Sequence, residues 1–369
     1  MSRQNIKAGL VEFRPDRAEA LASLLPGHGI TPVVFHTREL KTDSLRMASI
    51  APHHVARALT SEKCDIYIAA AWVWPALISA LSSMRPGSRS GCVLNAWIFD
   101  ESSYESRSSG NSFSVIRRKL YPRVYDIILD RASVIICNSN CVADSLNQTR
   151  PALTDKIRAI HNGIDFDLFE QLPKKMEPSC ARVFTSSNAN EGTKIKGLLT
   201  VIDAFGRIAG KHPGATLTAA VTATNVHAEE NMRQIEKAAD KSGCRDRIEL
   251  IPNARNMPEL YSGSYVFAYC TPHRGADSLP RVLLEAQCAS VPVVAGNESG
   301  CPEAIKPGAT GLLTENSPAG LAGGIDRLLS DATLRNSMAA ACGEWIKTEF
   351  SWEKMADGYA GAIREALEA

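Results

Sequence analysis

Two carboxylates lie near the start of one expected helix, and their spacing could let both bind the same ligand. Asp277 stands in a loop ahead of Pro280, and Glu285 follows after seven residues, about one and a half turns into the helix. Proline suits a first helical turn, because its φ is fixed and its missing N–H is not needed there. The free N–H groups and the dipole of a helix N-terminus attract phosphate. The pattern predicts a site that binds a phosphate, with an acid on either side to hold hydroxyls of the attached sugars.

The same two acids also have a structural interpretation. Asp277 could cap the helix through its carboxylate, and Glu285 could pair with Arg281 one turn earlier. Spacing alone favours this second interpretation, because short motifs often match by chance. The flanking sequence favours the binding site instead.

That flanking sequence resembles the donor-binding signature of the family 4 retaining glycosyltransferases. The signature has an acid, seven residues and a Glu ahead of a Pro-Val-Val-Ala strand, which occupies 292–295 here. Most members begin it with Glu-Gly-Phe, whereas the Asp-Ser-Leu-Pro stretch at 277–280 is similar to an Asp-Asn-Leu-Pro variant within the family. The resemblance implies that Asp277 holds hydroxyls of the donated sugar and that Glu285 holds the ribose of the nucleotide.

A nucleotide-sugar donor releases a negatively charged diphosphate, so catalysis needs cations or N–H dipoles aimed at that charge. Lys196 and Gly197 match the family's Lys-Gly, where the resemblance implies that the lysine neutralises the diphosphate as a point charge. A solvated lysine at a helix start is the ordinary alternative. The family usually has an arginine several residues earlier. The polar stretch 186–188 stands in that place, so Lys194 or Arg274 could substitute.

Three further segments resemble the family. The Asn-Gly turn at 162–163 is similar to the segment that closes the family's N-terminal domain, although such turns are common. Ser299 and Gly300, ahead of Pro-Glu, are similar to a family turn in which glycine lets the backbone approach a ligand. They could equally form only a tight turn. The Phe-Ser-Trp-Glu stretch at 350–353 resembles the start of the family's closing helix, which crosses back to the first domain.

The first half of the chain departs from the family. A Gly-Gly loop normally follows the first strand, but Glu-Phe-Arg-Pro occupies 12–15, where Arg14 could supply charge. A histidine that touches the reacting sugar normally follows the fourth strand. Phe99 stands there, so Asp100 is the nearest surviving match. These departures bear on activity and leave the expected fold unchanged.

The predicted site combines these residues and needs no metal. No Asp-x-Asp pair lies near the donor loops, which suits the metal-independent reaction that the resemblance implies, and no cofactor is expected. The catalytic members are Asp277, Lys196 and Asp100, and the donor-binding members are Glu285, Lys194, Arg274, Ser278, Leu279, Gly197 and Gly300.

The composition excludes several other classes of protein. The 369 residues are 44% hydrophobic and 22% charged, as in ordinary globular proteins, and their number suggests two domains. A net charge of +1 gives no general attraction for nucleic acid. Ten cysteines without a Cys-x-x-Cys pair argue against structural zinc. No signal peptide is evident and no apolar run approaches the ~20 residues of a membrane span, so a cytoplasmic protein is expected, with at most peripheral membrane contact.

Strands alternate with helices in both halves of the chain, which predicts an α/β fold with parallel sheets. Strands are expected at 6–13, 31–36, 65–71, 92–99, 133–137, 182–186, 215–221, 247–251, 265–270 and 293–295. With the resemblance, this predicts the GT-B architecture: two doubly wound, Rossmann-like domains facing a central cleft. The expected parts are an acceptor-side domain at 1–172, a nucleotide-sugar domain at 173–348 and a helix at 349–369 that crosses back.

The favoured hypothesis is a retaining glycosyltransferase. It would move a sugar from a uridine or guanosine nucleotide to an acceptor hydroxyl, in synthesis of surface polysaccharide or glycolipid. Alternatives are a catalytically reduced nucleotide-sugar-binding partner of another transferase, and a GT-B enzyme of another reaction, such as an epimerase. A basic helix could rest on an anionic membrane that carries a lipid-linked acceptor, or could be a solvated face. Its cations are Arg117, Arg118, Lys119 and Arg123.

Overall fold

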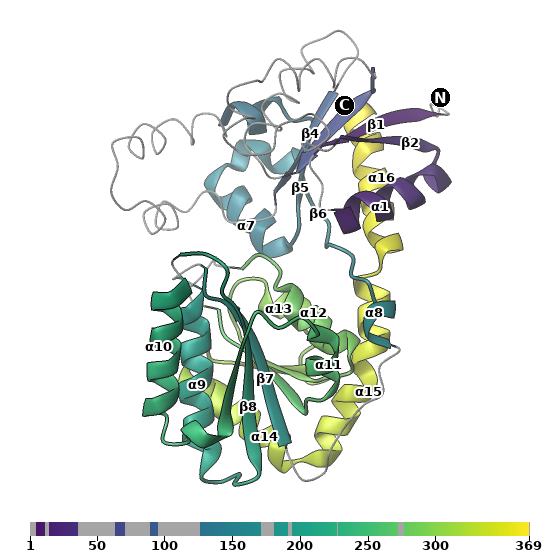
Figure 1. The fold of residues 1–369 in the computed structure, drawn as a ribbon. Coiled ribbons are helices and arrows are strands. Elements are labelled where there is room, and N and C mark those ends of the chain that lie inside the picture. The colour runs from purple at the N-terminus through teal and green to yellow at the C-terminus, as the bar shows by residue number, and fades with distance from the viewer. Residues whose placement is uncertain are drawn as a thin grey trace, which may run out of the picture. The chain divides into compact units, whose positions relative to one another are not determined.

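The protein consists of two structural units, seen in a computed structural model (Figure 1). Unit 1 is Met1–Gly163 with Phe350–Ala369, and unit 2 is Ile164–Glu349. The structure describes residues 5–11, 15–35, 63–70, 89–94, 126–170, 181–190, 194–226, 228–271 and 277–368. The sequence also predicts helices at 55–59 and 72–81, an exposed loop at 101–114 and a linker at 173–179, and all four segments lie outside the described residues.

Unit 1 contains a six-stranded sheet with the order β2-β1-β3-β4-β5-β6, and its paired strands are parallel. Short strands that are buried on both faces are typical of such sheets. The structure adds β6, a strand not expected from the sequence. The strands are β1 (Ile6–Val11), β2 (Ile30–Phe35), β3 (Ile66–Ala70), β4 (Arg89–Leu94), β5 (Val134–Cys137) and β6 (Ile157–Ala159).

Two apolar layers cover the two faces of this sheet. Ile6, Ala8 and Leu10 alternate along β1 and pack on one face with α1 and α16, whereas Val11 belongs to the cluster on the other face with α7. This is the period of two that a strand requires. The helices are α1 (Pro15–Leu24), η1 (Leu25–His28), α7 (Asn140–Thr149), η2 (Pro151–Lys156) and α16 (Trp352–Glu368).

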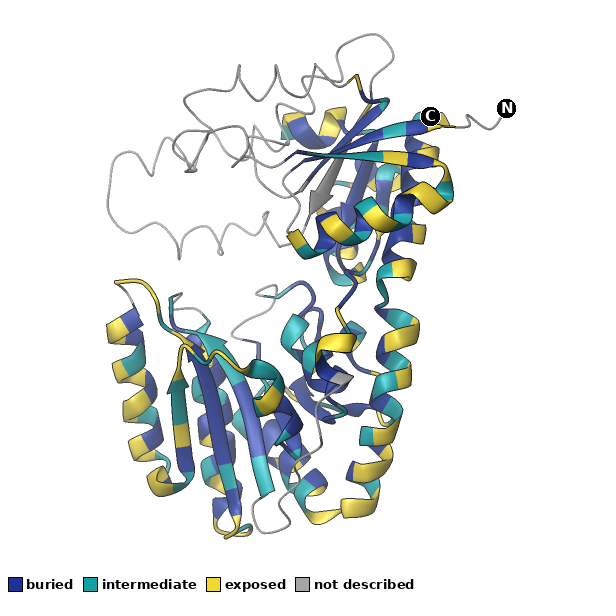
Figure 2. Cartoon of the chain, turned by 45° about the vertical axis from the view of Figure 1, so that its right-hand side comes forward, coloured by how far each residue is buried: buried dark blue, intermediate teal, exposed yellow. Residues whose placement is uncertain are grey.

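The last helix, α16, is part of the core of unit 1. Met355, Tyr359 and Ile363, spaced about one turn apart, are at most 1% exposed. The turn at 162–163 lies against the start of this helix: a Cβ added at Gly163 would stand 2.3 Å from the ring of Trp352. The two motifs that resemble the family in this region therefore meet in space. Figure 2 shows exposed residues on the outer faces of the helices and buried residues along the strands.

Unit 2 contains a second six-stranded parallel sheet, with the order β12-β11-β10-β7-β8-β9. The short strand β12 was not expected from the sequence. The strands are β7 (Ala181–Asn188), β8 (Ala215–Thr222), β9 (Ile248–Pro252), β10 (Val266–Tyr269), β11 (Val293–Gly296) and β12 (Gly311–Thr314).

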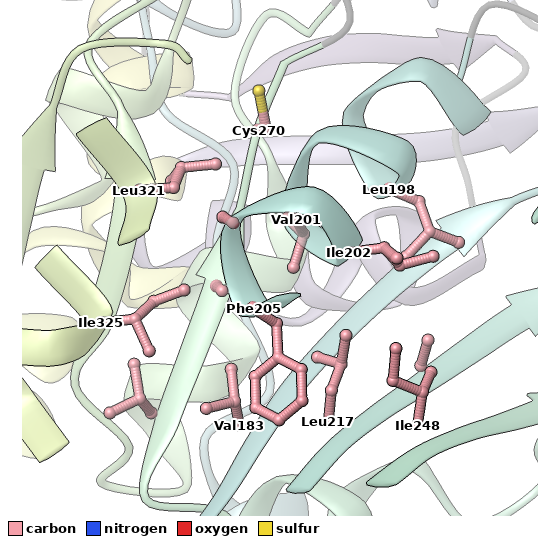
Figure 3. Close-up of a cluster of buried hydrophobic side chains, with 14 of the residues drawn as sticks. Val183, Leu198, Val201, Ile202, Phe205, Leu217, Ile248, Cys270, Leu321 and Ile325 are labelled. Carbon is pink, nitrogen blue, oxygen red and sulfur yellow. The ribbon is translucent and has the colours of Figure 1, made fainter. Parts of the chain in front are cut away.

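Helices cover both faces of the second sheet, which makes it doubly wound. On one face α9, α10 and α14 pack on the strands, and Figure 3 shows Val201 and Phe205 of α9 directed at Val183 and Leu217. Phe184 points to the other face, where the centroid of its ring lies 5.6 Å from the centroid of the Phe267 ring. The helices are α8 (Asp167–Glu170), α9 (Ile195–Ala209), α10 (Ala228–Lys241), η3 (Arg245–Arg247), α11 (Met257–Ser262), α12 (Arg281–Cys288), α13 (Cys301–Ala304), α14 (Pro318–Ser330) and α15 (Ala332–Glu349).

Two parallel, Rossmann-like sheets confirm the predicted α/β fold class. Within the described residues, no helix combines the length and the apolar character needed to cross a membrane.

Candidate active site

A pocket of about 370 Å³ opens at the carboxyl edge of the sheet in unit 2. It lies where the strand order reverses: β8 and β9 extend from β7 on one side, whereas β11 and β12 extend from β10 on the other. The loops after two such strands diverge to opposite faces and leave a crevice, which is where ligands bind in open α/β sheets. The ends of β7, β8 and β10 and the starts of α9 and α12 contribute lining residues.

The predicted acid Asp277 lines this pocket, and its carboxylate has two protein partners. Lys194 pairs with Oδ1, and the hydroxyl of Tyr269 donates to Oδ2. The helix behind it begins at Arg281, and its N-cap position is Pro280, which has no side-chain acceptor. The structure therefore contradicts the alternative in which the Asp277 carboxylate caps the helix.

Tyr269 is a site residue that the sequence reasoning missed. Burial, followed by the nearby charge of Asp277, raises the pKa of the Tyr269 hydroxyl well above its usual value. The phenol therefore stays protonated at neutral pH and acts as a hydrogen-bond donor to the carboxylate. It could not be recognised from the sequence, because a tyrosine at the end of a buried strand is usually a core residue.

The second predicted acid, Glu285, is held from below by a buried tyrosine. The Tyr261 hydroxyl donates to Oε2 at 2.9 Å, and Nε of Arg281 lies 3.9 Å from Oε1. Burial, followed by the charge of Glu285, raises the pKa of Tyr261 well above its usual value. Both the pairing with Arg281 and a fixed carboxylate are thus present. The Glu285 side chain is 23% exposed, so it retains access to solvent.

The glycine at 300 has a clear packing role. A Cβ added to Gly300 would stand 1.7 Å from the carbonyl oxygen of Ser278, and its N–H donates to the carbonyl oxygen of Asp277 at 3.2 Å. The turn after β11 thus supports the loop that carries the acid. Ser278 and Leu279 are both buried, at 9% and 6% exposure, and Leu279 lines the pocket.

The two candidate lysines at the start of α9 differ in position. Lys194 and Gly197 line the pocket, whereas Lys196 is exposed and is not among the lining residues. The cation that the structure brings to Asp277 is therefore Lys194, which the sequence offered only as a substitute. A direct contact between Lys196 and the diphosphate stays a prediction.

Polar side chains hold the loops around the pocket together. Asn190 Oδ1 accepts hydrogen bonds from the backbone N–H groups of Thr224 and Asn225 at 2.7 and 3.0 Å, which joins the loop after β7 to the loop after β8. Ser187 donates to the carbonyl oxygen of Lys194 at 3.2 Å. These bonds fix the backbone from which Lys194 projects.

Several predicted residues cannot be placed. Asp100, Arg274 and the basic cluster of Arg117, Arg118, Lys119 and Arg123 lie outside the described residues, as does Arg14. Within the part of the chain that is described, no group of three or more His, Cys, Asp or Glu side chains could hold a metal ion. Arg281, considered from the sequence only as a partner of Glu285, also lines the pocket.

Comparisons with known families identify the family of the chain. A family model described as Glycosyl transferases group 1 matches residues 183–345, and one described as Glycosyltransferase Family 4 matches residues 3–168. Together they span most of the chain, which therefore belongs to the group 1, family 4 glycosyltransferases. The predicted family is thereby confirmed, whereas the activity of the whole protein and the motif variant at 277–280 stay predictions.

Curated relatives align with part of the chain. It is 30% identical over 176 residues to a GDP-mannose-dependent alpha-(1-6)-phosphatidylinositol monomannoside mannosyltransferase of Mycobacterium tuberculosis, covering 46% of this chain and 44% of the relative. It is 21% identical over 248 residues to spore coat protein SA of Bacillus subtilis, covering 63% of this chain and 65% of the relative. The matched region is thus less than two thirds of the length of either relative.

Solved structures share the fold over nearly the full chain. Alr3699/HepE of Anabaena, in complex with UDP, superposes with a TM-score of 0.72 at 18% identity, covering 97% of this chain and 99% of that one. A glycosyltransferase from Rickettsia africae ESF-5 superposes with a TM-score of 0.74 at 17% identity, covering 100% of both chains. These likenesses confirm the predicted GT-B fold.

Proposed function

We propose that the protein is a retaining glycosyltransferase that moves a sugar from a nucleoside-diphosphate sugar to an acceptor hydroxyl. The observation that carries this proposal is the pocket of unit 2, where Lys194, Asp277 and Arg281 line the edge at which the strand order reverses. One acid and two cations suit a ligand that combines sugar hydroxyls with a diphosphate. The family to which the chain belongs supports the reaction class.

Each group has a distinct part in the proposed reaction. The two cations and the first N–H groups of α12 stabilise the negative charge that develops on the departing diphosphate. Asp277, held by Tyr269, orients the sugar, and Glu285 accepts hydroxyl donors from the ribose. The departing phosphate itself accepts the proton of the acceptor hydroxyl on the same face of the sugar, so the configuration at the anomeric carbon is retained.

The donor and the acceptor are proposed from the relatives. The Mycobacterium tuberculosis protein is named as a GDP-mannose-dependent phosphatidylinositol monomannoside mannosyltransferase, and the Anabaena protein was solved with UDP and with UDP-glucose. We therefore propose a hexose on GDP or UDP as donor, and a lipid-linked or polysaccharide acceptor at the cytoplasmic membrane surface. Contact with that surface through the basic cluster at 117–123 remains part of this proposal.

A nucleotide-sugar screen tests the proposal. Thermal-shift measurements with GDP-mannose, UDP-glucose and related donors should raise the melting temperature, because a ligand that binds only the folded state stabilises it. The best donor is then incubated with candidate acceptors, and the anomeric configuration of the product is determined. Inversion at the anomeric carbon would contradict retention. Binding without transfer or hydrolysis would favour the catalytically reduced alternative, which the departures at 12–15 and Phe99 motivate.

The ribose role of Glu285 has its own test. Glu285→Ala should weaken nucleotide binding by roughly tenfold or more, since hydrogen bonds to a charged group contribute about 1.5–3 kcal/mol. Tyr261→Phe is the matched control: it removes the supporting hydrogen bond at 2.9 Å and leaves the carboxylate in place. Its effect should be clearly smaller. Donor affinity that does not change in Glu285→Ala would reject the role.

A further inference from the structure

The charged residues that line the pocket, among those described, are Lys194, Asp277 and Arg281. Asp277 is the single acid of the three, and one of its oxygens is paired with Lys194 while the other accepts from Tyr269. The Lys194 and Asp277 side chains are 26% and 17% exposed, so water screens their attraction only in part. Any anionic ligand in this pocket meets a lysine that already has an anionic partner.

The geometry points to an exchange of partners: Lys194 leaves Asp277 for the diphosphate when the donor binds, and Oδ1 of Asp277 then accepts a sugar hydroxyl. This inference rests on the proposed function and deepens it. Lys194 becomes a specificity-determining residue, because the oxygen that holds the sugar is released only when a diphosphate is present. A free sugar carries no diphosphate to attract Lys194, so it leaves Oδ1 of Asp277 paired with the lysine.

The exchange needs only the lysine side chain to move. The Ser187 hydroxyl donates a hydrogen bond to the backbone carbonyl oxygen of Lys194 at 3.2 Å, and the Gly300 N–H donates one to the backbone carbonyl oxygen of Asp277 at 3.2 Å. These bonds fix the backbone of both residues. Tyr269 retains Oδ2 throughout, because its half-buried hydroxyl is a protonated donor. The carboxylate thus keeps its orientation while its other oxygen changes partner. Lysine suits this part, since its ammonium is a point charge on a flexible stem.

A double-mutant cycle distinguishes exchange from a lysine that contacts both anions at once. Affinities for UDP and GDP are measured by calorimetry for the unaltered protein, Lys194→Met, Asp277→Asn and the double variant. Exchange predicts that Asp277→Asn tightens binding of the better nucleotide about five- to tenfold, because no ion pair has to be broken. It also predicts that Lys194→Met weakens nucleotide binding more in the Asp277→Asn background than in the unaltered protein. The two losses of affinity should differ by about five- to tenfold.

The contrary results are equally distinct. Equal effects of Lys194→Met in the two backgrounds would mean that the lysine bridges both anions, and would overturn the exchange alone. If neither nucleotide bound the unaltered protein, both the exchange and the proposed function would be overturned. Lys194→Gln serves as a second variant, and melting temperatures establish that each variant folds.

The sugar supplies an independent readout. The affinity ratio between GDP-mannose and GDP, or between UDP-glucose and UDP, should fall toward one in Asp277→Asn. In this variant the amide oxygen keeps the hydrogen bond from Tyr269, and the NH2 group, which is a donor, takes the place of the acceptor Oδ1. A ratio equal to that of the unaltered protein would overturn the part assigned to Oδ1.

A matched control lies near the opposite end of α9. Lys211 Nζ pairs with Asp326 at 2.7 Å, and neither residue lines the pocket. Lys211→Met, Asp326→Asn and their double variant should lower stability without changing either nucleotide affinity. A comparable gain in affinity from Asp326→Asn would show that net charge alone explains the Asp277 result, and would overturn the exchange.

Discussion

The two units have the same kind of sheet but connect its strands in different orders. In unit 1 the second strand in sequence lies at the edge beside the first, and the order reverses between β1 and β3. In unit 2 three strands lie on each side of the reversal, which falls between β7 and β10. Since ligands bind where the order reverses, the connection of the strands, more than their composition, determines which loops form a site.

The described cores of the units differ in what completes them. Unit 1 covers one face of its sheet with α16, a helix from the far end of the chain, whereas unit 2 covers both faces with helices from its own stretch of sequence. Unit 2 also contains a cluster of four aromatic rings, from Phe169, Phe184, Tyr261 and Phe267, beneath the helix that carries Glu285. The two cores should therefore respond separately to mutation.

The largest effects should come from removing one large side chain from each core. Phe267→Ala in unit 2 and Tyr359→Ala in unit 1 each remove a ring that is at most 1% exposed, at an expected cost of about 3–5 kcal/mol. In scanning calorimetry, Phe267→Ala should lower the transition that nucleotide stabilises, and Tyr359→Ala should lower the other. A single transition that both variants lower equally would show that the units unfold together.

A smaller effect is expected from adding a methyl group to glycines in close contact. Gly300→Ala places a Cβ 1.7 Å from Ser278, and Gly163→Ala places one 2.3 Å from Trp352. Each should destabilise the protein by about 1–3 kcal/mol through overpacking. Nucleotide affinity should fall only in Gly300→Ala, because that glycine supports the Asp277 loop. Loss of affinity in both variants would break the distinction between the two units.

Low pH should lower the stability of unit 2 by protonating one carboxylate, that of Asp326. Hydrogen bonds from Lys211 and His212 lower the pKa of Asp326 from its usual 3.8. The folded state therefore gains stability that is fully present above the unfolded pKa and is lost as pH falls through the lower, folded pKa. Asp326→Asn should be less stable by about 0.5–1 kcal/mol at pH 6, with the difference shrinking below about pH 4. Chemical denaturation across this range measures it, and a constant difference would refute the linkage.

The smallest effect should be a gain in stability in each unit. Apart from the neighbouring backbone of the helix itself, nothing lies within 4 Å of a Cβ added at Gly323 in α14 or at Gly361 in α16. Alanine lowers the entropy of the unfolded chain, so each substitution should stabilise its unit by about 0.4–1 kcal/mol. Gly323→Ala should raise the nucleotide-sensitive transition and Gly361→Ala the other. Unfolding midpoints measured with and without nucleotide identify the two transitions. The prediction is wrong if Gly323→Ala raises the nucleotide-insensitive transition or Gly361→Ala the nucleotide-sensitive one.

Local patterns were sufficient to predict most of the elements of both sheets. The apolar runs at β5, β8 and β10 and the amphipathic helix α9 have lengths and periods that neighbouring residues determine. The strands β6 and β12 were missed because they are three and four residues long, with a single buried position each. Such strands are stabilised by the sheet they join and carry little signal of their own.

The choice between Lys194 and Lys196 could not be made from the sequence. Residues two positions apart on a helix point in nearly opposite directions, because each residue turns the chain by about 100°. Which of them faces the pocket depends on how α9 is rotated against the sheet, and that rotation is set by the packing of Val201, Phe205 and their neighbours.

By itself, the sequence determined the parallel α/β class, the two acids with seven residues between them and the glycine turns that accompany them. Only the tertiary structure decided the strand order and the partners of those acids: Tyr269 and Lys194 for Asp277, and Tyr261 for Glu285. The reason is physical. Helix and strand periods depend on interactions within a few residues, whereas a hydrogen bond between distant residues depends on how the sheet brings separate loops to one edge.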